Sequence, residues 1–191
     1  MKKTVWRPVA LGVVMGLLAG IATVTRLSFL SSGADIDNAI GFYMTLLLIA
    51  AALGGPLAGV LASSLFITLS ALYGPPEMKA VLGEPGIFWS NMLVIGILMV
   101  LVGFAYRLIF ERIKMPARLL LWMGIVISVY LLSSPANVIL QSYFLGDMAN
   151  LTHVLFSYKS YIPQAFFDIL ITSMVFLALP ARYRRPLWTQ H

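Results

Sequence analysis

The sequence predicts an all-α integral membrane protein, a bundle of about six transmembrane helices that forms a single domain over residues 1–191. Three observations lead to this prediction. Of the 191 residues, 60% are hydrophobic and only 10% are charged, whereas a soluble domain carries about 25% charged residues. Apolar segments of roughly the 20 residues needed for a span follow one another along the chain. The basic residues gather in alternate connections between these segments, as the positive-inside rule requires.

The first apolar segment runs from about Pro8 to Thr25 and follows the basic residues Lys2, Lys3 and Arg7. A secretory signal peptide starts in the same way, but this segment lacks a clear small-x-small cleavage site at its end. We therefore expect it to be retained as the first helix.

Two shorter apolar segments follow, at residues 39–53 and 57–72. Gly54-Gly55-Pro56 separates them and predicts a tight turn, because Gly and Pro interrupt helices. Both segments are short for a full span. They are expected to be the second and third helices, and a re-entrant hairpin is the alternative.

Three longer segments complete the predicted bundle, at residues 87–109, 119–139 and 163–179. The stretch between the last two, residues 141–162, is expected to be a loop that lies over the outer face as a lid.

The distribution of charge tests the number of spans. Six spans with both termini in the cytoplasm place ten basic residues inside and three outside, which is the asymmetry of the positive-inside rule. Five spans would split the basic clusters between the two sides. The inner set is Lys2, Lys3, Arg7, Arg107, Arg112, Lys114, Arg118, Arg182, Arg184 and Arg185, and the outer set is Arg26, Lys79 and Lys159.

Several classes of function are disfavoured by composition. The chain has no cysteine, so disulfides and thiolate metal sites are excluded, and His153 and His191 are isolated. The net charge of +6 sits at helix ends rather than on one stripe, which does not indicate nucleic-acid binding. No phosphate-binding glycine loop and no serine-histidine-acid set occurs. We expect a protein that is not an enzyme and holds no cofactor.

A ridge of small residues marks the first helix, where Gly12, Gly16 and Gly20 recur every four residues. Small residues at this spacing let another helix backbone approach closely. The ridge is expected to dock a partner subunit, and packing within the bundle is the alternative.

Asp168 is the acid that lies within an apolar helix, about five residues inside the start of the last segment. An ionisable group at membrane depth is costly unless it faces a cavity or a partner, so Asp168 is a candidate functional residue. The alternative is an interfacial position where Asp168 bonds Tyr161 or Gln164.

Polar and aromatic side chains cluster at the predicted outer ends of the last three helices. An apolar, aromatic-lined cavity with a few hydrogen-bonding groups is typical of a small-molecule site. An aromatic belt at the membrane interface is the alternative for the aromatic residues. With Asp168, the expected ligand-binding residues are Trp89, Asn91, Asn137, Gln141, Tyr161 and Gln164.

The run LLLIAAALGGPLAGVLAS (residues 46–63) resembles the second and third helices of the substrate-binding S components of energy-coupling-factor vitamin transporters. YIPQAFFDILITSMVF (residues 161–176) is similar to their sixth helix. The resemblance implies six helices with cytoplasmic termini and a first-helix ridge that meets a membrane coupling subunit. It also implies a vitamin or micronutrient ligand that enters from outside, and cytoplasmic ATPase partners.

The same GGPLAG segment, preceded by Gly33-Ala34-Asp35-Ile36-Asp37, also resembles the membrane sensor modules of LytS-type histidine kinases. That pattern usually has an arginine after the aspartate and another near the end of the third helix. Here Asn38 and Leu72-Tyr73 stand at those positions.

The sequence thus favours a membrane-embedded small-molecule binding subunit of an uptake transporter in a bacterial cytoplasmic membrane, in contact with lipid. A LytS-type sensor module and an accessory scaffold subunit of a larger membrane complex are the alternatives. Neighbouring ATPases, a kinase or cyclase domain, or a multi-subunit enzyme would distinguish the three.

Overall fold

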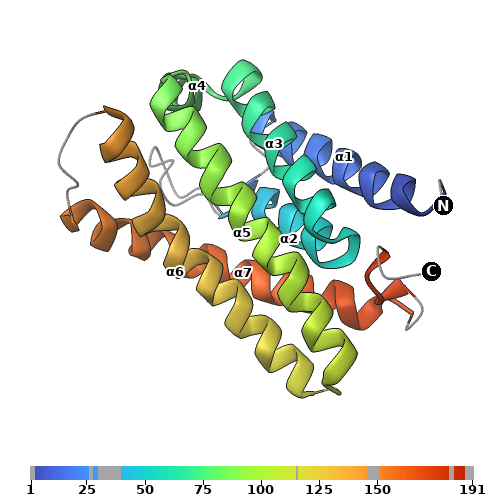
Figure 1. Cartoon of the computed structure of the whole chain (residues 1–191). Coiled ribbons are helices and arrows are strands. Elements are labelled where there is room, and N and C mark those ends of the chain that lie inside the picture. The colour runs from blue at the N-terminus through green and yellow to red at the C-terminus, as the bar shows by residue number, and fades with distance from the viewer. Residues whose placement is uncertain are drawn as a thin grey trace.

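The computed structural model of the chain describes residues 3–25, 28–29, 40–114, 116–145, 151–180 and 183–187. Within these ranges it holds seven helices and one pair of two-residue strands (Figure 1). Strand β1 pairs antiparallel with β2, Ser28 opposite Gly41 and Phe29 opposite Ile40. The elements are α1 (Lys3–Val24), β1 (Ser28–Phe29), β2 (Ile40–Gly41), α2 (Tyr43–Gly54), α3 (Pro56–Tyr73), α4 (Pro76–Leu82), α5 (Pro85–Arg112), α6 (Ala117–Leu145) and α7 (Leu151–Ala178).

The helical membrane fold predicted from the sequence is confirmed, although one of the six expected spans is a short helix. Five helices are long and apolar enough to cross a membrane, so the chain is a multi-pass membrane protein. Helix α2 has 12 residues, which is about 18 Å of helix and less than the thickness of a bilayer core. The spans are Trp6–Val24, Pro56–Tyr73, Pro85–Arg112, Ala117–Phe144 and Tyr161–Ala178.

Helix α2 lies in the middle of the bundle, where α1, α3, α5 and α7 contact it (Figure 1). All of its residues from Leu47 to Gly54 are buried, together with Met44 and Thr45. A helix that is apolar all round has no face to present to water and is stable only when it is enclosed. Helix α2 is therefore a short helix that is stabilised by the four helices around it.

The turn between α2 and α3 packs against α5. Gly55 has φ 83°, a left-handed conformation that favours glycine, and Pro56 opens α3. A Cβ atom on Gly103 of α5 would lie 2.7 Å from the backbone N of Pro56. Since α5 continues for nine residues from Gly103 to Arg112, the turn lies about 14 Å before the end of α5. The α2–α3 hairpin thus turns before the neighbouring helix α5 ends. In this respect it resembles the re-entrant hairpin that was considered as the alternative.

The glycines of α1 face α3. A Cβ atom on Gly12 would lie 2.7 Å from the carbonyl O of Ala58, and one on Gly16 would lie 2.8 Å from the carbonyl O of Ala62. Gly20 meets the side chain of Leu69 in the same way. Because α3 covers this ridge, a partner subunit has no access to Gly12, Gly16 and Gly20 in this arrangement. The structure corresponds to the alternative, packing within the bundle.

Helices α6 and α7 are longer than the sequence predicts, so the expected lid over residues 141–162 is wrong. Helix α6 continues through Pro135 to Leu145, and α7 begins at Leu151 and passes through Pro163. Proline is tolerated inside transmembrane helices, because neighbouring groups satisfy the backbone that it frees. Of the expected lid, residues 146–150 lie outside the described residues, as do Arg26, residues 33–37, Arg182 and His191.

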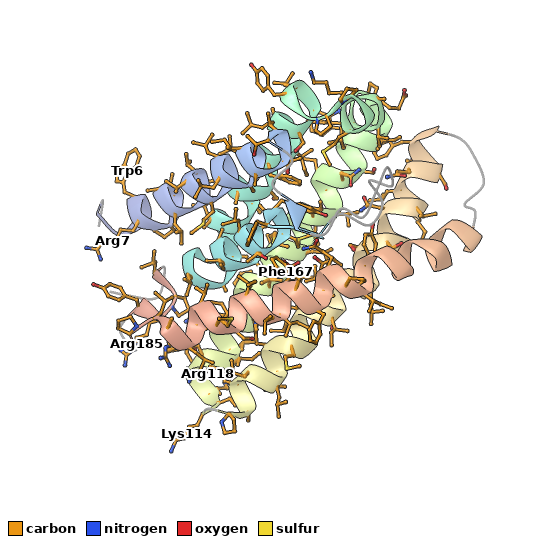
Figure 2. The ribbon with its side chains drawn as sticks, turned by 180° about the vertical axis from the view of Figure 1, so that it is seen from behind. Trp6, Arg7, Lys114, Arg118, Phe167 and Arg185 are labelled. Carbon is orange, nitrogen blue, oxygen red and sulfur yellow. The ribbon has the colours of Figure 1, made fainter. Side chains whose placement is uncertain are left out.

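Charge is concentrated at one end of the bundle, where α1 begins and α7 ends (Figure 1). Figure 2 shows Arg7, Lys114, Arg118 and Arg185 at this end, together with Trp6. We call it the basic end. The short helix α4, with Lys79, lies at the opposite end.

Candidate functional site

The buried acid Asp168 lies near the middle of the span formed by α7. Its side chain is fully buried, with 0% exposure. The span runs from Tyr161 to Ala178, so Asp168 is about 10 Å from one end and about 15 Å from the other along the helix axis. A carboxyl group buried at this place in the helix needs compensating partners, and Gln164, which the interfacial alternative names, is one of them.

Hydroxyl groups from two other helices donate hydrogen bonds to the Asp168 carboxyl group. Thr45 of α2 bonds Oδ1 and Tyr130 of α6 bonds Oδ2. Gln164, one turn earlier on α7, donates from Nε2 to Oδ2 at 3.1 Å. All four side chains are buried, with at most 5% exposure. One carboxyl group thus ties α2, α6 and α7 together through donors that carry no charge.

The carboxyl group also lies at the N-terminus of α2. Phe42, the residue before the helix, provides no side-chain cap, and the first backbone N–H groups of a helix need acceptors from elsewhere. Asp168 accepts a hydrogen bond from the backbone N–H of Thr45 as well as from its hydroxyl. A negative group is favourable at the positive end of a helix dipole. Asp168 therefore caps α2 from a different helix.

Gln164 holds the extended segment that leads into α2. Its amide accepts a hydrogen bond from the backbone N–H of Gly41 at 2.8 Å and donates one to the carbonyl O of Gly41, also at 2.8 Å. Non-helical backbone at membrane depth must find its hydrogen bonds within the protein. The Gln164 side chain supplies both, and its bond to Asp168 connects Gly41 to the buried carboxyl group.

The network continues along α7 toward the basic end. Thr172 donates a hydrogen bond to the backbone O of Asp168 at 2.5 Å and accepts one from the indole Nε1 of Trp122 at 2.8 Å. The Trp122 ring packs edge-on against Tyr106 and Phe176, with ring centroids 5.5 and 5.0 Å apart. A continuous polar chain thus leads from Gly41 through Asp168 to an aromatic cluster near the basic end.

In the other direction the two facing helices carry further polar groups. The Tyr161 ring lies 5.7 Å from the Tyr130 ring. Asn137 stands seven residues after Tyr130 on α6, and Tyr161 stands seven before Asp168 on the antiparallel α7, so both lie about two turns from the Tyr130–Asp168 bond. Within the described residues, Oδ1 of Asn137 is buried and accepts no hydrogen bond. Such an atom needs a donor from a ligand or a water molecule.

The structure brings three of the sequence-predicted residues, Tyr161, Gln164 and Asp168, around the Tyr130 side chain. Asn137 and Gln141 are half-buried further along α6. We call Asn137, Gln141, Tyr130, Tyr161, Gln164 and Asp168 the α6–α7 polar site.

Two sequence-predicted residues on α5 lie apart from this network. Trp89 is 55% exposed and shares a stripe with exposed Leu93 and Ile97, which matches the aromatic-belt alternative. Asn91 donates from Nδ2 to the carbonyl O of Ile87 in its own helix at 2.9 Å.

Thr45 and Tyr130 belong to the site but are missing from the sequence prediction. Thr45 stands in the first turn of α2, just before an uninterrupted apolar run, and a polar group beside such a run is a usable signal. Tyr130 lies seven residues before Asn137, on the same face of a helix. Helical spacing along α6 points to this residue, although it does not identify Asp168 as its partner.

Comparison of the chain with protein-family models, with curated proteins and with solved structures gives no match.

Proposed function

We propose that the chain is a membrane-embedded binding subunit of an uptake transporter and that it takes a small molecule, in the size range of a vitamin or micronutrient, into the α6–α7 polar site. The basic end would face the cytoplasm, with both termini on that side of a bacterial cytoplasmic membrane. Binding sites of this kind combine apolar and aromatic walls with a few hydrogen-bonding groups that fix the ligand's orientation.

The observation that carries the proposal is a buried polar chain at membrane depth, with a buried and unsatisfied acceptor about two helical turns from it on α6. Tyr130 and Gln164 both donate hydrogen bonds to Asp168, whereas the buried Oδ1 of Asn137 accepts no hydrogen bond in the described part of the chain. An unsatisfied buried acceptor costs about 1–3 kcal/mol. A ligand that donates an N–H or O–H group would remove this cost.

Discontinuous helices support the transporter class. In many transporters a half-helix begins near the middle of the membrane and its terminus meets an ion or substrate group. Helix α2 begins beside Asp168 after the extended Gly41 segment, which is an arrangement of that type. Since the sequence has no nucleotide-binding motif, energy would come from cytoplasmic ATPases through a membrane coupling subunit. That subunit would contact a surface other than the Gly12–Gly16–Gly20 ridge, which α3 covers.

The first experiment is purification of the tagged chain in mild detergent, with native mass spectrometry of the particle and of small molecules released from it. We expect a bound small molecule, and co-purifying ATPases with a membrane subunit. Asn137→Leu should lower ligand occupancy by at least about tenfold, the effect of losing one buried hydrogen bond. Asn91→Leu, whose amide bonds its own helix, should leave occupancy within about twofold.

Two outcomes would count against this function. A kinase or cyclase as the co-purifying protein would favour the LytS-type sensor, and an unrelated enzyme complex would favour the scaffold. Equal occupancy in both asparagine variants would place the ligand outside the α6–α7 polar site.

A further inference from the structure

A small recess lies at the basic end, where α5 ends, α6 begins and the chain leaves α7. Six residues line it: Tyr106, Arg118, Leu119, Trp122, Phe176 and Arg184. Four of them give it apolar and aromatic walls, and both arginines are half-buried at its edge. Figure 2 shows Arg118 at this end of the bundle, together with Lys114 and Arg185.

The Arg118 guanidinium group is fixed in place at the C-terminus of α5. Nε and Nη2 donate to the carbonyl O of Ile113 at 3.1 and 2.7 Å, and Nη2 also donates to the carbonyl O of Phe110 at 3.2 Å. Its Cζ atom lies 4.1 Å from the centre of the Phe110 ring. A guanidinium group has five N–H donors, so the two on Nη1 are not used by these bonds.

The Arg184 guanidinium group is fixed in the same way at the C-terminus of α7. Nε donates to the carbonyl O of Leu179 at 2.6 Å and Nη2 to that of Leu177 at 2.8 Å. The hydroxyl of Tyr106 donates to the backbone O of Arg184 at 3.1 Å. Both arginines line the same recess, and the hydrogen bonds to these carbonyl groups leave the Nη1 donors of both unused.

The recess has no negative side chain of its own within the described residues. The acid near this end is Glu111, and Arg107 binds it at 2.8 Å. Arg112 in the last turn of α5, and Lys114 and Arg185 in Figure 2, add further positive charge to this end of the bundle. An anion between the two guanidinium groups would be attracted by both of them, and planar guanidinium groups match the oxygens of a phosphate.

We propose that this recess binds the phosphate group of an anionic phospholipid of the cytoplasmic leaflet. The phosphate would lie between the Nη1 groups of Arg118 and Arg184. The recess is at the end of the membrane-crossing helices, where lipid headgroups lie, and exposed Leu120 and Leu177 stand beside it to meet the acyl chains (67% and 50% exposed). A lipid therefore fits this position better than a soluble phosphate, and basic pockets between helices are known headgroup sites.

The test compares three titrations of the purified chain in neutral detergent: phosphatidylglycerol, phosphatidylcholine and inorganic phosphate. We expect phosphatidylglycerol alone to bind and to raise the unfolding temperature. In the double variant Arg118→Gln/Arg184→Gln, the dissociation constant for phosphatidylglycerol should rise at least about tenfold, since two charge-assisted contacts are lost. The matched control Arg112→Gln/Lys114→Gln removes the same charge from the same end and should change it less than about threefold.

The double variant also removes the helix caps that both arginines provide, so a second variant tests the recess with these caps in place. Leu119→Glu places a carboxylate in the recess and leaves both guanidinium groups and their backbone bonds intact. It should weaken phosphatidylglycerol binding as strongly as the double variant does. If the Arg112/Lys114 control weakens phosphatidylglycerol binding equally, the lipid is held by general attraction to a charged surface and not by this recess. Inorganic phosphate as effective as the lipid would show an anion site without lipid recognition.

Discussion

Asp168 is stabilised at membrane depth without a basic partner among its hydrogen-bonding residues. Thr45, Tyr130 and Gln164 surround the carboxyl group with donors, and the N-terminus of α2 adds a positive partial charge. Each donor also depends on the carboxyl group, because buried hydroxyl and amide groups are costly when unsatisfied. The cluster therefore has to form as a unit, and a change at one member is felt by the others.

We predict strong energetic coupling between Asp168 and Tyr130. Asp168→Asn removes the charge-assisted acceptor, and Tyr130→Phe removes the donor. In a double-mutant cycle on the free energy of unfolding, the coupling should reach about 1 kcal/mol or more. The cycle is measured by denaturant unfolding in detergent.

A matched cycle provides the control for this coupling. Asp168→Asn combined with Ser128→Ala, an exposed α6 residue that bonds its own helix at Gly124, should be additive within about 0.5 kcal/mol. Additivity of the Asp168 and Tyr130 variants as well would show that the bond between them contributes nothing to stability.

Gln164 provides the second residue-level prediction. Gln164→Leu keeps the volume of the side chain but leaves the N–H and C=O of Gly41 without partners. The free energy of unfolding should fall by about 2–4 kcal/mol, the cost of two unsatisfied backbone groups. Gln141→Leu on α6 should cost less than about 1 kcal/mol, since no such pair of bonds depends on it. If both variants lower the free energy of unfolding equally, the bonds from Gln164 to the Gly41 backbone do not contribute to stability as proposed.

The sequence identifies members of the site but not how they are connected. Asp168 and Gln164 are recognisable because polar groups in an apolar helix need a reason to be there. Their partner Thr45 is 123 positions away from Asp168 along the chain, and only tertiary packing brings the two together. Trp89 is a residue type that often lines binding sites, but it lies on an exposed face of α5.

At the scale of single elements, part of the structure of α2 can be predicted from the sequence and part depends on tertiary packing. The Gly54-Gly55-Pro56 turn and the limited length of the second segment are readable from the sequence. The enclosure of α2 by four helices depends on contacts that no local pattern encodes. The predicted start of the last helix at Pro163 is wrong, because a proline that starts a helix and one inside a transmembrane helix look alike in sequence. The predicted helix 119–139 already contains Pro135, and α6 continues beyond its predicted end to Leu145.

The contact between α1 and α3 gives a prediction for these two elements. Gly16→Ala places a Cβ atom 2.8 Å from the carbonyl O of Ala62 and 2.9 Å from the Ala62 Cα. Both atoms belong to backbone, so the helices must move apart. The free energy of unfolding should fall by about 1–3 kcal/mol, as for other overpacked positions.

Gly124→Ala is the matched control, because a Cβ atom on this α6 glycine meets nothing within 4 Å. Alanine is the better helix former, so this variant should be neutral or stabilising by up to about 1 kcal/mol. Unfolding of both variants at the same denaturant concentration would contradict the close α1–α3 contact.

At the scale of the whole molecule, the polar network connects the two proposed sites. Trp122 bonds Thr172, which bonds the backbone of Asp168, and Trp122 also lines the recess at the basic end. The connection runs along α7, which ends at the Arg184 cap. Helix α7 thus carries the buried carboxyl group in its middle, and the arginine of the proposed lipid site caps its end.

Topology is the prediction that belongs to this scale, and the absence of cysteine makes it directly testable. Single cysteines at exposed Ala80 in α4 and Ala117 at the start of α6 leave unchanged the charges that set orientation. In intact cells, a membrane-impermeant maleimide should label Ala80→Cys. Ala117→Cys should be labelled only after the membrane is permeabilised. The reverse result would turn the basic end outward and overturn the proposed orientation.

The same labelling decides whether α2 brings the chain back across the membrane. Trp6 and Tyr183 are exposed at the two ends of the described chain, by 71% and 50%. If α2 together with the Gly41 segment completes a crossing, the chain crosses six times, and Trp6→Cys and Tyr183→Cys should both be protected like Ala117→Cys. Five crossings would leave them on opposite sides, with one labelled in intact cells. Protection of both is expected, because a tight turn joins α2 to α3 and the basic residues near Trp6 and Tyr183 lie at one end of the bundle.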